Sequence, residues 1–264
     1  MSLYDAVAPN FDRHRAIPGA AVEAIRAAML AAISPVSRPR FLDIGAGTGR
    51  IGLPFVAAGN DYVGVDSSLE MLYQFAERSR RHIDPPPSLV QSDGQFLPFR
   101  DATFDAVMLI QIFGGLRGWR QVLAEGRRVL RPAGAVFVGR SVAPATGLDA
   151  QMKQHLAFIL SEIDVRPDVA NAREDVLRWL EAASESSARV LAATWDAERT
   201  PREFLERHRT GASFSVLPAP VKDEALSELS AWAAAKFGSL DAVRPERHVF
   251  ELRVFRFREE GVPR

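Results

Sequence analysis

Residues 40–49 read RFLDIGAGTG, a short apolar run that passes directly into a glycine-rich loop. The apolar run predicts a buried parallel strand, and the glycines let the next residues turn tightly and approach a ligand closely. A helix expected over 51–58 would direct its unpaired N–H groups at the loop, which favours an anionic group there. The G-x-G-x-G spacing of Gly45, Gly47 and Gly49 differs from the G-x-G-x-x-G of dinucleotide-binding loops. Taken alone, the loop is also consistent with a simple turn.

Strand-like and helix-like segments alternate on both sides of this loop. The expected strands are 40–44, 62–65, 89–91, 104–112 and 135–138, and the expected helices are 20–33, 51–58, 68–82 and 119–130. Strands joined by helices favour right-handed crossovers and a parallel, doubly wound α/β sheet. Such sheets bind ligands at the carboxyl ends of their strands.

The second half of the chain has a different pattern. Helical periodicity over 148–163 and 175–183 follows the fifth strand without an intervening strand. It predicts a helical cap near the carboxyl edge of the sheet. A strand over 190–195, helices over 201–208 and 222–237 and an alternating final strand over 248–257 follow. We expect one domain over 1–264, made of an N-terminal cover and first helix (1–35), a ligand-binding core (40–141), a helical cap (146–187) and a C-terminal part of the sheet (188–264).

Three aspartates follow successive strands. Asp43 stands two residues before the first glycine, Asp66 ends the second strand, and Asp93 follows the third. One such aspartate alone would be a helix cap or a turn residue. Three at one sheet edge instead indicate a ligand site, and a carboxylate at Asp66 can accept hydrogen bonds from a ribose diol.

Composition narrows the classes of partner. Lys and Arg number 33, as do Asp and Glu, so the formal net charge is +0, which argues against nucleic acid and against a polybasic membrane patch. The absence of cysteine excludes disulfides, zinc–thiolate sites and cysteine nucleophiles, and the histidines lack metal-ligand spacing. No apolar run approaches the ~18 residues of a membrane span. We expect a cytoplasmic protein without a metal, either a monomer or a homodimer.

Four stretches in this order resemble the class I S-adenosylmethionine (SAM)-dependent methyltransferases, and most nearly their ubiquinone/menaquinone-biosynthesis type. They are FLDIGAGTGR (41–50), VGVDSSLEML (63–72), SDGQFLPFRDATFDAVML (92–109) and WRQVLAEGRRVLRPAGAVFV (119–138). The resemblance covers about residues 4–141. It implies a Rossmann-like, seven-stranded sheet with an antiparallel last strand, SAM as cofactor, S-adenosylhomocysteine (SAH) as product, and methyl transfer to a small molecule by in-line displacement.

The resemblance also implies roles for the matched residues. The loop passing beside the methionine and ribose parts of SAM would be Gly45, Ala46, Gly47 and Gly49. Asp43 would help hold the amino group, Asp66 would bind the ribose hydroxyls, and Arg15 could pair with the carboxylate. The adenine would be contacted by Ser67, Met71, Asp93, Gly94 and Gln95. Gln111 and Ile112 would lie by the sulfonium.

The chain departs from the family after the fourth strand. Many members carry a histidine-containing segment there, followed by Pro-Asp-Trp, whereas residues 112–119 read IFGGLRGW and keep only Trp119. A mechanism that uses that histidine as a base is therefore not carried over, and no catalytic residue is assigned. The expected lining of the substrate pocket is Phe11, His14, Phe113, His155 and Trp195.

Three functions remain open at this point. The leading one is a SAM-dependent methyltransferase whose acceptor atom (oxygen, nitrogen or carbon) the sequence does not give. The second is a protein that binds SAM or SAH without methyl transfer. The third is an NAD(P)-dependent oxidoreductase, which the G-x-G-x-G spacing and Asp93 disfavour.

Overall fold

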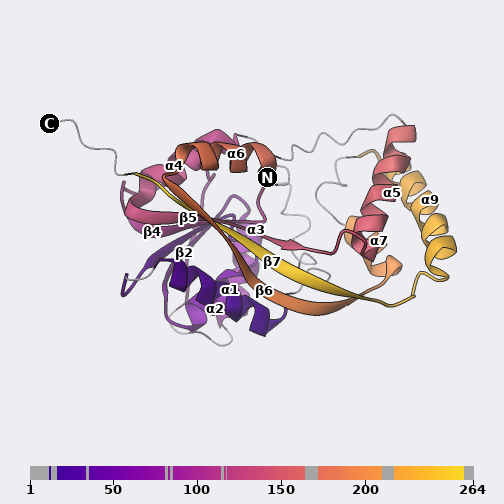
Figure 1. Ribbon diagram of the computed structural model, residues 1–264, viewed down its shortest axis with the longest axis horizontal. Coiled ribbons are helices and arrows are strands. Elements are labelled where there is room, and N and C mark those ends of the chain that lie inside the picture. The colour runs from indigo at the N-terminus through magenta and orange to yellow at the C-terminus, as the bar shows by residue number, and fades with distance from the viewer. Residues whose placement is uncertain are drawn as a thin grey trace.

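The computed structural model describes residues 12, 17–33, 36–80, 83, 86–113, 116, 118–163, 172–209 and 217–258. A seven-stranded sheet in the order β3-β2-β1-β4-β5-β7-β6 forms its centre (Figure 1). The strands are β1 (Arg40–Ile44), β2 (Asp61–Asp66), β3 (Ser88–Gln91), β4 (Phe104–Ile110), β5 (Leu130–Val142), β6 (Ser186–Arg199) and β7 (Arg244–Arg256). The helices are α1 (Gly19–Ala32), α2 (Gly52–Ala57), α3 (Leu69–Arg80), α4 (Trp119–Val129), α5 (Leu148–Glu162), α6 (Arg173–Ala183), α7 (Pro201–Arg209) and α9 (Ala219–Phe237).

The predicted doubly wound sheet is confirmed. Strands β1 to β5 pair in parallel, and β7 runs antiparallel between β5 and β6, with Gly139 opposite Leu252. The strand order reverses between β1 and β4, which is the switch point where ligands bind in such sheets. This arrangement is the Rossmann-like fold with an antiparallel last strand.

Strands β6 and β7 are longer than predicted. They pair with each other over their whole lengths, from Ser186 opposite Arg256 to Arg199 opposite Arg244, and form a ribbon that continues past β5. Much of β6 is exposed and polar, so hydrophobic periodicity does not mark its ends. The length of β6 is instead set by its pairing with β7, which follows it in the chain after α7 and α9.

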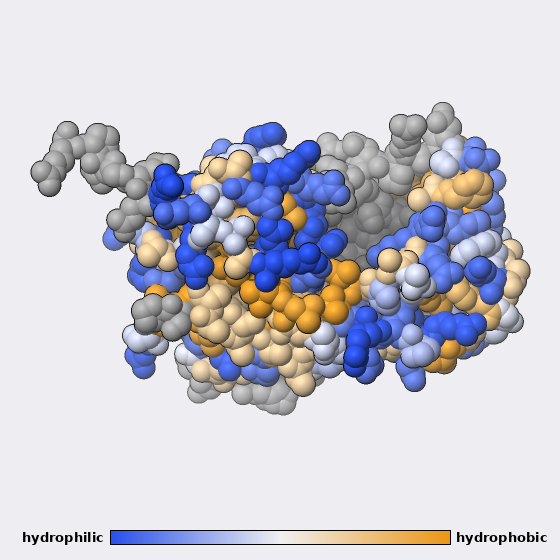
Figure 2. Space-filling model, in the orientation of Figure 1, coloured by the Kyte–Doolittle hydropathy of each residue, from blue (hydrophilic) through white to orange (hydrophobic). Residues whose placement is uncertain are grey.

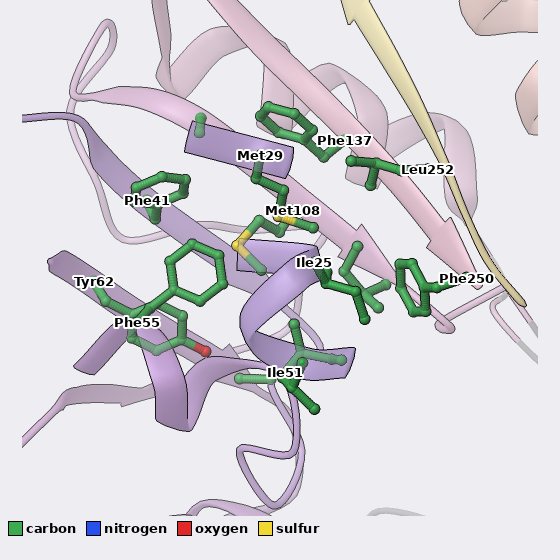
Figure 3. Close-up of a cluster of buried hydrophobic side chains, with 14 of the residues drawn as sticks. Ile25, Met29, Phe41, Ile51, Phe55, Tyr62, Met108, Phe137, Phe250 and Leu252 are labelled. Carbon is green, nitrogen blue, oxygen red and sulfur yellow. The ribbon is translucent and has the colours of Figure 1, made fainter. Parts of the chain in front are cut away.

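One face of the sheet is covered by α1, α2 and α3. Figure 3 shows Ile25 and Met29 of α1 in the same cluster as side chains from the strands, and the rings of Phe41 and Phe55 pack with centroids 4.8 Å apart. Full burial of one such side chain stabilises the fold by ~1.5–3 kcal/mol. Figure 2 shows a hydrophobic strip of surface over α1 and β6 in the middle of the molecule.

The second face is covered by α4 and α6. Val176 and Leu180 of α6 are fully buried in the same cluster as Val136 and Val138 of β5. Helix α5 instead shares a separate core with α7 and α9, and this helical unit lies at the far end of the β6–β7 ribbon (Figure 1). The helices of the expected cap over 146–187 thus belong to two different hydrophobic clusters, α6 to that of the sheet and α5 to that of α7 and α9. Periodicity shows that a helix has an apolar stripe, but not which surface that stripe covers.

An arginine on α4 holds the segment that follows β3. Arg128 donates to the carbonyls of Leu97 and Phe99 at 3.0 and 2.8 Å, and it pairs with Glu125 and Asp101 at 2.7 Å. Glu125 also accepts the Leu97 N–H at 2.8 Å, and the hydrogen bond from Arg128 lowers the pKa of Glu125.

We expect Arg128→Ala to lower the free energy of unfolding by ~1–2 kcal/mol, because it removes several charge-assisted hydrogen bonds from a side chain that is 32% exposed. Urea denaturation of the variant measures this loss. Arg120→Ala, on the same helix, is the control, and equal midpoints for the two variants would contradict the assigned role.

Candidate functional site

A cavity of about 430 Å³ opens at the carboxyl ends of β1, β2 and β4. Its lining includes Asp43, Gly45, Ala46, Gly47, Asp66, Ser67, Met71, Asp93, Gly94, Gln95, Gln111 and Ile112. These are the residues predicted to contact SAM, apart from Gly49 and Arg15. Residues far apart in the sequence therefore meet at the switch point of the sheet.

The glycine loop is tied to β2 by its backbone. The N–H groups of Gly45 and Ala46 donate to the Val65 carbonyl at 2.8 and 2.9 Å. The Gly47 N–H donates to Oδ2 of Asp66 at 2.9 Å. These three bonds fix the loop against the second strand and give the cavity a rigid wall.

The three loop glycines have positive φ angles of 78°, 55° and 77°, but different surroundings. A Cβ on Gly45 would lie 2.6 Å from a side-chain carbon of Ile112, and one on Gly49 would lie 2.3 Å from the Phe75 ring. A Cβ on Gly47 would meet no atom closer than 4.0 Å. The packing of the core therefore requires a residue without a side chain at position 49. At position 47 the absence of a side chain leaves space in the cavity.

Asp43 is a buried carboxylate in the cavity wall, 3% exposed. The Tyr62 hydroxyl donates to its Oδ2 at 2.8 Å. Burial raises the pKa of Asp43 to about 7; the hydrogen bond from Tyr62 opposes this shift and the neighbouring Asp66 charge adds to it. Burial also raises the pKa of Tyr62, so Tyr62 stays a neutral donor. A ligand cation at this place would restore the ionised form of Asp43.

Asp66 is the last residue of β2, and two backbone N–H groups fix the orientation of its carboxylate. Its Oδ2 accepts the Gly47 N–H, and its Oδ1 accepts the Ser68 N–H at 2.9 Å. Asp93, after β3, accepts the Gln95 N–H at 2.9 Å and so closes a turn. Both carboxylates face the cavity from neighbouring strand ends.

Gln111 follows β4 with a φ of 58°, which is uncommon for a residue other than glycine. Its N–H donates to the Gly139 carbonyl at 2.9 Å, and its side-chain amide joins Arg50 to the Ser141 hydroxyl. Such backbone strain persists only where the surroundings hold it, and it gathers at functional sites.

Several polar residues of the site were not predicted from the sequence. Arg50, Thr48 and Ser92 line the cavity, and the Thr48 hydroxyl donates to Asp12 at 2.7 Å while Arg78 pairs with the same carboxylate. The only local signal for Arg50 and Thr48 is their place inside and just after the glycine loop. Nothing in the sequence indicates that Arg78, on α3, reaches this loop.

Three expected substrate-pocket residues lie elsewhere. Phe113 is buried in the α4 and α6 face of the sheet. His155 stacks on Trp232 with ring centroids 4.0 Å apart in the helical unit, and Trp195 on β6 lies against His248. None of the three lines the cavity, because their elements pack against other partners. Phe11, His14 and Arg15 lie outside the described residues.

The described residues contain neither a metal-binding group nor a membrane-spanning helix. Among these residues no group of three or more His, Cys, Asp or Glu side chains is arranged to hold a metal ion. Within the same residues, no helix is long and apolar enough to cross a membrane.

Comparison with known proteins agrees with this geometry. Residues 42–138 match the family described as a methyltransferase domain. The chain is 33% identical over 147 residues to a demethylmenaquinone methyltransferase of Renibacterium salmoninarum, covering 55% of this chain and 60% of that protein. It is 30% identical over 204 residues to the demethylmenaquinone methyltransferase of Thermobifida fusca, covering 74% of this chain and 85% of the relative.

Solved structures share the fold. The YcgJ protein of Bacillus subtilis has a TM-score of 0.57 and 18% identity, over 89% of this chain and 98% of that one. The [4+2]-cyclase SpnF has a TM-score of 0.54 and 20% identity, over 97% and 95%. The cavity, the glycine loop and these relatives together place the chain in the class I SAM-dependent methyltransferase family, in the branch that includes the demethylmenaquinone methyltransferases.

Proposed function

We propose that this chain transfers a methyl group from SAM to a small-molecule acceptor. The observation that carries the proposal is the convergence of Asp43, Asp66, Asp93 and the glycine loop on one cavity. The chemistry of the cavity lining suits such a cofactor, because it includes the buried carboxylate of Asp43 and the carboxylates of Asp66 and Asp93 for cationic and hydroxyl groups. The lining also includes apolar side chains, among them Ile112, Leu116 and Val122.

Each part of the cavity has a proposed task. Asp43 would hold the cofactor ammonium, Asp66 would accept from the ribose hydroxyls, and Asp93 would accept from the adenine amino group. The open space at Gly47 would let the backbone approach the ribose. Ser67 and Met71 would line the adenine side, with Gly94 and Gln95 against the ring.

When bound, SAM supplies a methyl group on a sulfonium, and the leaving thioether is neutral. The task of the protein is therefore to orient two reactants and to exclude water. Gln111, held from both sides by Arg50 and Ser141, lies where the acceptor would approach, at the end of β4. No histidine is among the described residues that line the cavity, and no base is proposed.

Several finer properties are part of the proposal. We propose a small molecule rather than nucleic acid as acceptor, since the formal net charge is +0. We also propose a cytoplasmic location and a monomer or homodimer. The relatives described above are named demethylmenaquinone methyltransferases. A quinone-like compound is therefore the first acceptor to test. The alignment spans only 60% of the Renibacterium relative, so the acceptor of this chain needs its own assay.

We expect Asp66→Ala to weaken SAM and SAH binding about 30-fold, because a hydrogen bond to a charged group stabilises by ~1.5–3 kcal/mol. Isothermal titration calorimetry measures the affinities. Asp61→Ala is the matched control at the other end of β2, where the Asp61 side chain is 56% exposed. Unchanged affinity in Asp66→Ala would contradict the ribose role, and binding of NAD in place of SAM would overturn the whole proposal.

We keep SAM or SAH binding without methyl transfer as the alternative function. The described part of the cavity wall lacks a histidine, and residues 112–119 depart from the family pattern. An assay for SAH release with quinols, phenols and amines as acceptors separates the two. Tight SAM binding without SAH release for any acceptor would favour the binding function.

A further inference from the structure

Strand β6 lies at the end of the sheet, and in the described part of the chain only one of its two edges is paired. It pairs with β7 alone, along the whole of its 14 residues from Ser186 to Arg199. The backbone N–H and C=O groups on its other edge therefore point away from the sheet. Such a row of groups is a template for pairing with a strand of another chain, and this row is longer than the ~5–6 residues of an average strand.

The side chains of β6 are exposed on the face that α1 does not cover. Val190 and Trp195 pack against the hydrophobic cluster that α1 helps to form. On the other face Leu191 is 62% exposed, and the side chains of Arg189 and Asp196 are 69% and 76% exposed. The hydrophobic strip over α1 and β6 lies open on the face of the molecule that Figure 2 shows. A partner that covers β6 therefore has to offer apolar contacts and opposite charges together.

The sequence of β6 is complementary to itself in an antiparallel pair. In one register, Arg189 would lie opposite Asp196 of the second copy, and Leu191 would lie opposite Thr194 of the second copy. Residues directly opposite each other in an antiparallel pair point to the same face of the sheet. These four residues meet that condition, because they lie opposite every second residue of β7. This register, called the matched register below, therefore joins opposite charges and covers the exposed leucine at the same time.

Neighbouring registers lack this match. If the second copy moved by two residues in one direction, Leu191 would lie opposite the carboxylate of Asp196. If it moved by two residues in the other direction, Arg189 would lie opposite Thr194, and Asp196 would have no charge across from it. The β-bulge between Leu191 and Ala193 lies at the centre of the matched register. Both copies have the bulge there, so the extra residue does not shift the pairing.

Arg189 and Asp196 each have an ion-pair partner in their own chain. Arg189 pairs with Glu251 of β7, and Asp196 pairs with Arg247 of β7 at 3.2 Å. In the matched register these two pairs would join, one from each copy, into a row of alternating charge. Exposed ion pairs contribute little singly and more when they form a network. The second copy therefore extends existing ion pairs and needs no unpaired charge.

We propose that β6 pairs with β6 of a second copy of this chain, antiparallel and in the matched register. The two-fold axis passes between Ala192 and Ala193, so every contact occurs twice. About 12 residues of each strand, over a length of ~40 Å, pair and join the two sheets into one. Strands β5 and β7 lie between this seam and β4, so the seam is separate from the strands that form the cavity. The inference does not depend on methyl transfer, and it selects the homodimer from the two oligomeric states proposed above.

The test uses the absence of cysteine from the chain, because every thiol is then an added one. Two single variants, Leu191→Cys and Thr194→Cys, are oxidised separately and as an equal mixture. In the matched register the mixture brings two thiols onto directly opposite residues, whose Cα atoms are ~4.5–5.5 Å apart and within reach of a disulfide. Each variant alone places its two thiols three residues out of register, roughly 10 Å along the strand, which is too far. We expect at least 10-fold more covalent dimer, at about 58 kDa or twice 29.0 kDa, in the mixture than in either variant alone.

Sedimentation equilibrium of the unmodified chain measures association without a cross-link. We expect a dimer at micromolar concentration, and Leu191→Glu should raise its dissociation constant at least 10-fold, because it places a carboxylate in the apolar part of the seam. Tyr73→Glu is the matched control and should keep the wild-type dissociation constant. Tyr73 is 54% exposed on α3, which packs against β2 and β3 at the other end of the sheet.

Each outcome decides for or against the seam. A monomer of 29.0 kDa at the highest concentration measured overturns the inference. Equal cross-linking in the mixture and in the single variants also overturns it, as does a dimer that Leu191→Glu leaves unchanged. Circular dichroism shows whether Leu191→Glu is folded, and the milder cysteine variants decide the question if it is not. A monomer that still binds SAM in calorimetry leaves the proposed function intact, so the two can fail separately.

Discussion

Gly49→Ala is expected to destabilise the fold by about 2–5 kcal/mol. A left-handed backbone costs a non-glycine residue ~1–2 kcal/mol, and overpacking of a filled core costs ~1–3 kcal/mol. Both costs apply, since Gly49 has a φ of 77° and its added Cβ would lie 2.3 Å from the fully buried Phe75 ring. Chemical denaturation of the ligand-free protein measures the change.

Gly47→Ala is the matched comparison on the same loop. Its φ of 55° imposes a similar backbone cost, but the added Cβ would meet nothing closer than 4.0 Å. We therefore expect a loss of only ~1–2 kcal/mol in stability. Gly47→Ala should weaken SAM binding, because its methyl group would project into the cavity. Equal destabilisation by the two substitutions would contradict the division of roles between Gly47 and Gly49.

Asp43→Asn is expected to change how stability depends on pH. Burial raises the pKa of Asp43 from 3.8 to about 7 in the folded protein. Between these values the folded state keeps a proton that the unfolded state has lost, so the wild-type protein loses stability as the pH rises through that window. One pKa unit corresponds to ~1.4 kcal/mol, which gives a loss of roughly 4–5 kcal/mol between the acidic end of this window and pH 8.

The asparagine variant has no carboxylate to ionise, and the Tyr62 hydroxyl can still donate to its amide oxygen. We expect residue 43 to add no pH dependence to the free energy of unfolding of this variant. Above pH 7 the variant should be more stable than the wild type. Urea denaturation at pH 5, 6, 7 and 8 gives the two curves. Asp61→Asn, at the exposed start of β2, is the control and should keep the wild-type slope.

Cofactor binding should change in the opposite direction. Wild-type affinity for SAM is expected to rise as the pH approaches 7, because the ionised Asp43 pairs with the ligand ammonium. Asp43→Asn should bind SAM more weakly at pH 8 and without this dependence on pH. Parallel pH profiles of SAM affinity in the two proteins would exclude Asp43 as the partner of the ammonium group.

Much of the fold and the site could be predicted from the sequence because the signals are local. The run before Gly45, the glycine loop and the aspartates at strand ends each lie within a few residues. Parallel strands put their carboxyl ends at one edge, so Asp43, Asp66 and Asp93 had to meet there. The ends of β6 could not be predicted, because an exposed polar strand is defined by its partner and not by its own periodicity.

By itself, the sequence determined the order of the strands and helices along the chain, the edge of the sheet that carries the cavity, and the glycine loop and aspartates that line it. These follow from turn chemistry and hydrophobic period, which act over short distances along the chain. Only the tertiary structure decided that Gly49 serves the core while Gly47 serves the cavity, that α6 covers the sheet while α5 joins α7 and α9, and that Arg140 meets Glu251 across 111 residues. Each of these depends on which distant surfaces come into contact, and such contacts leave no local pattern in the sequence.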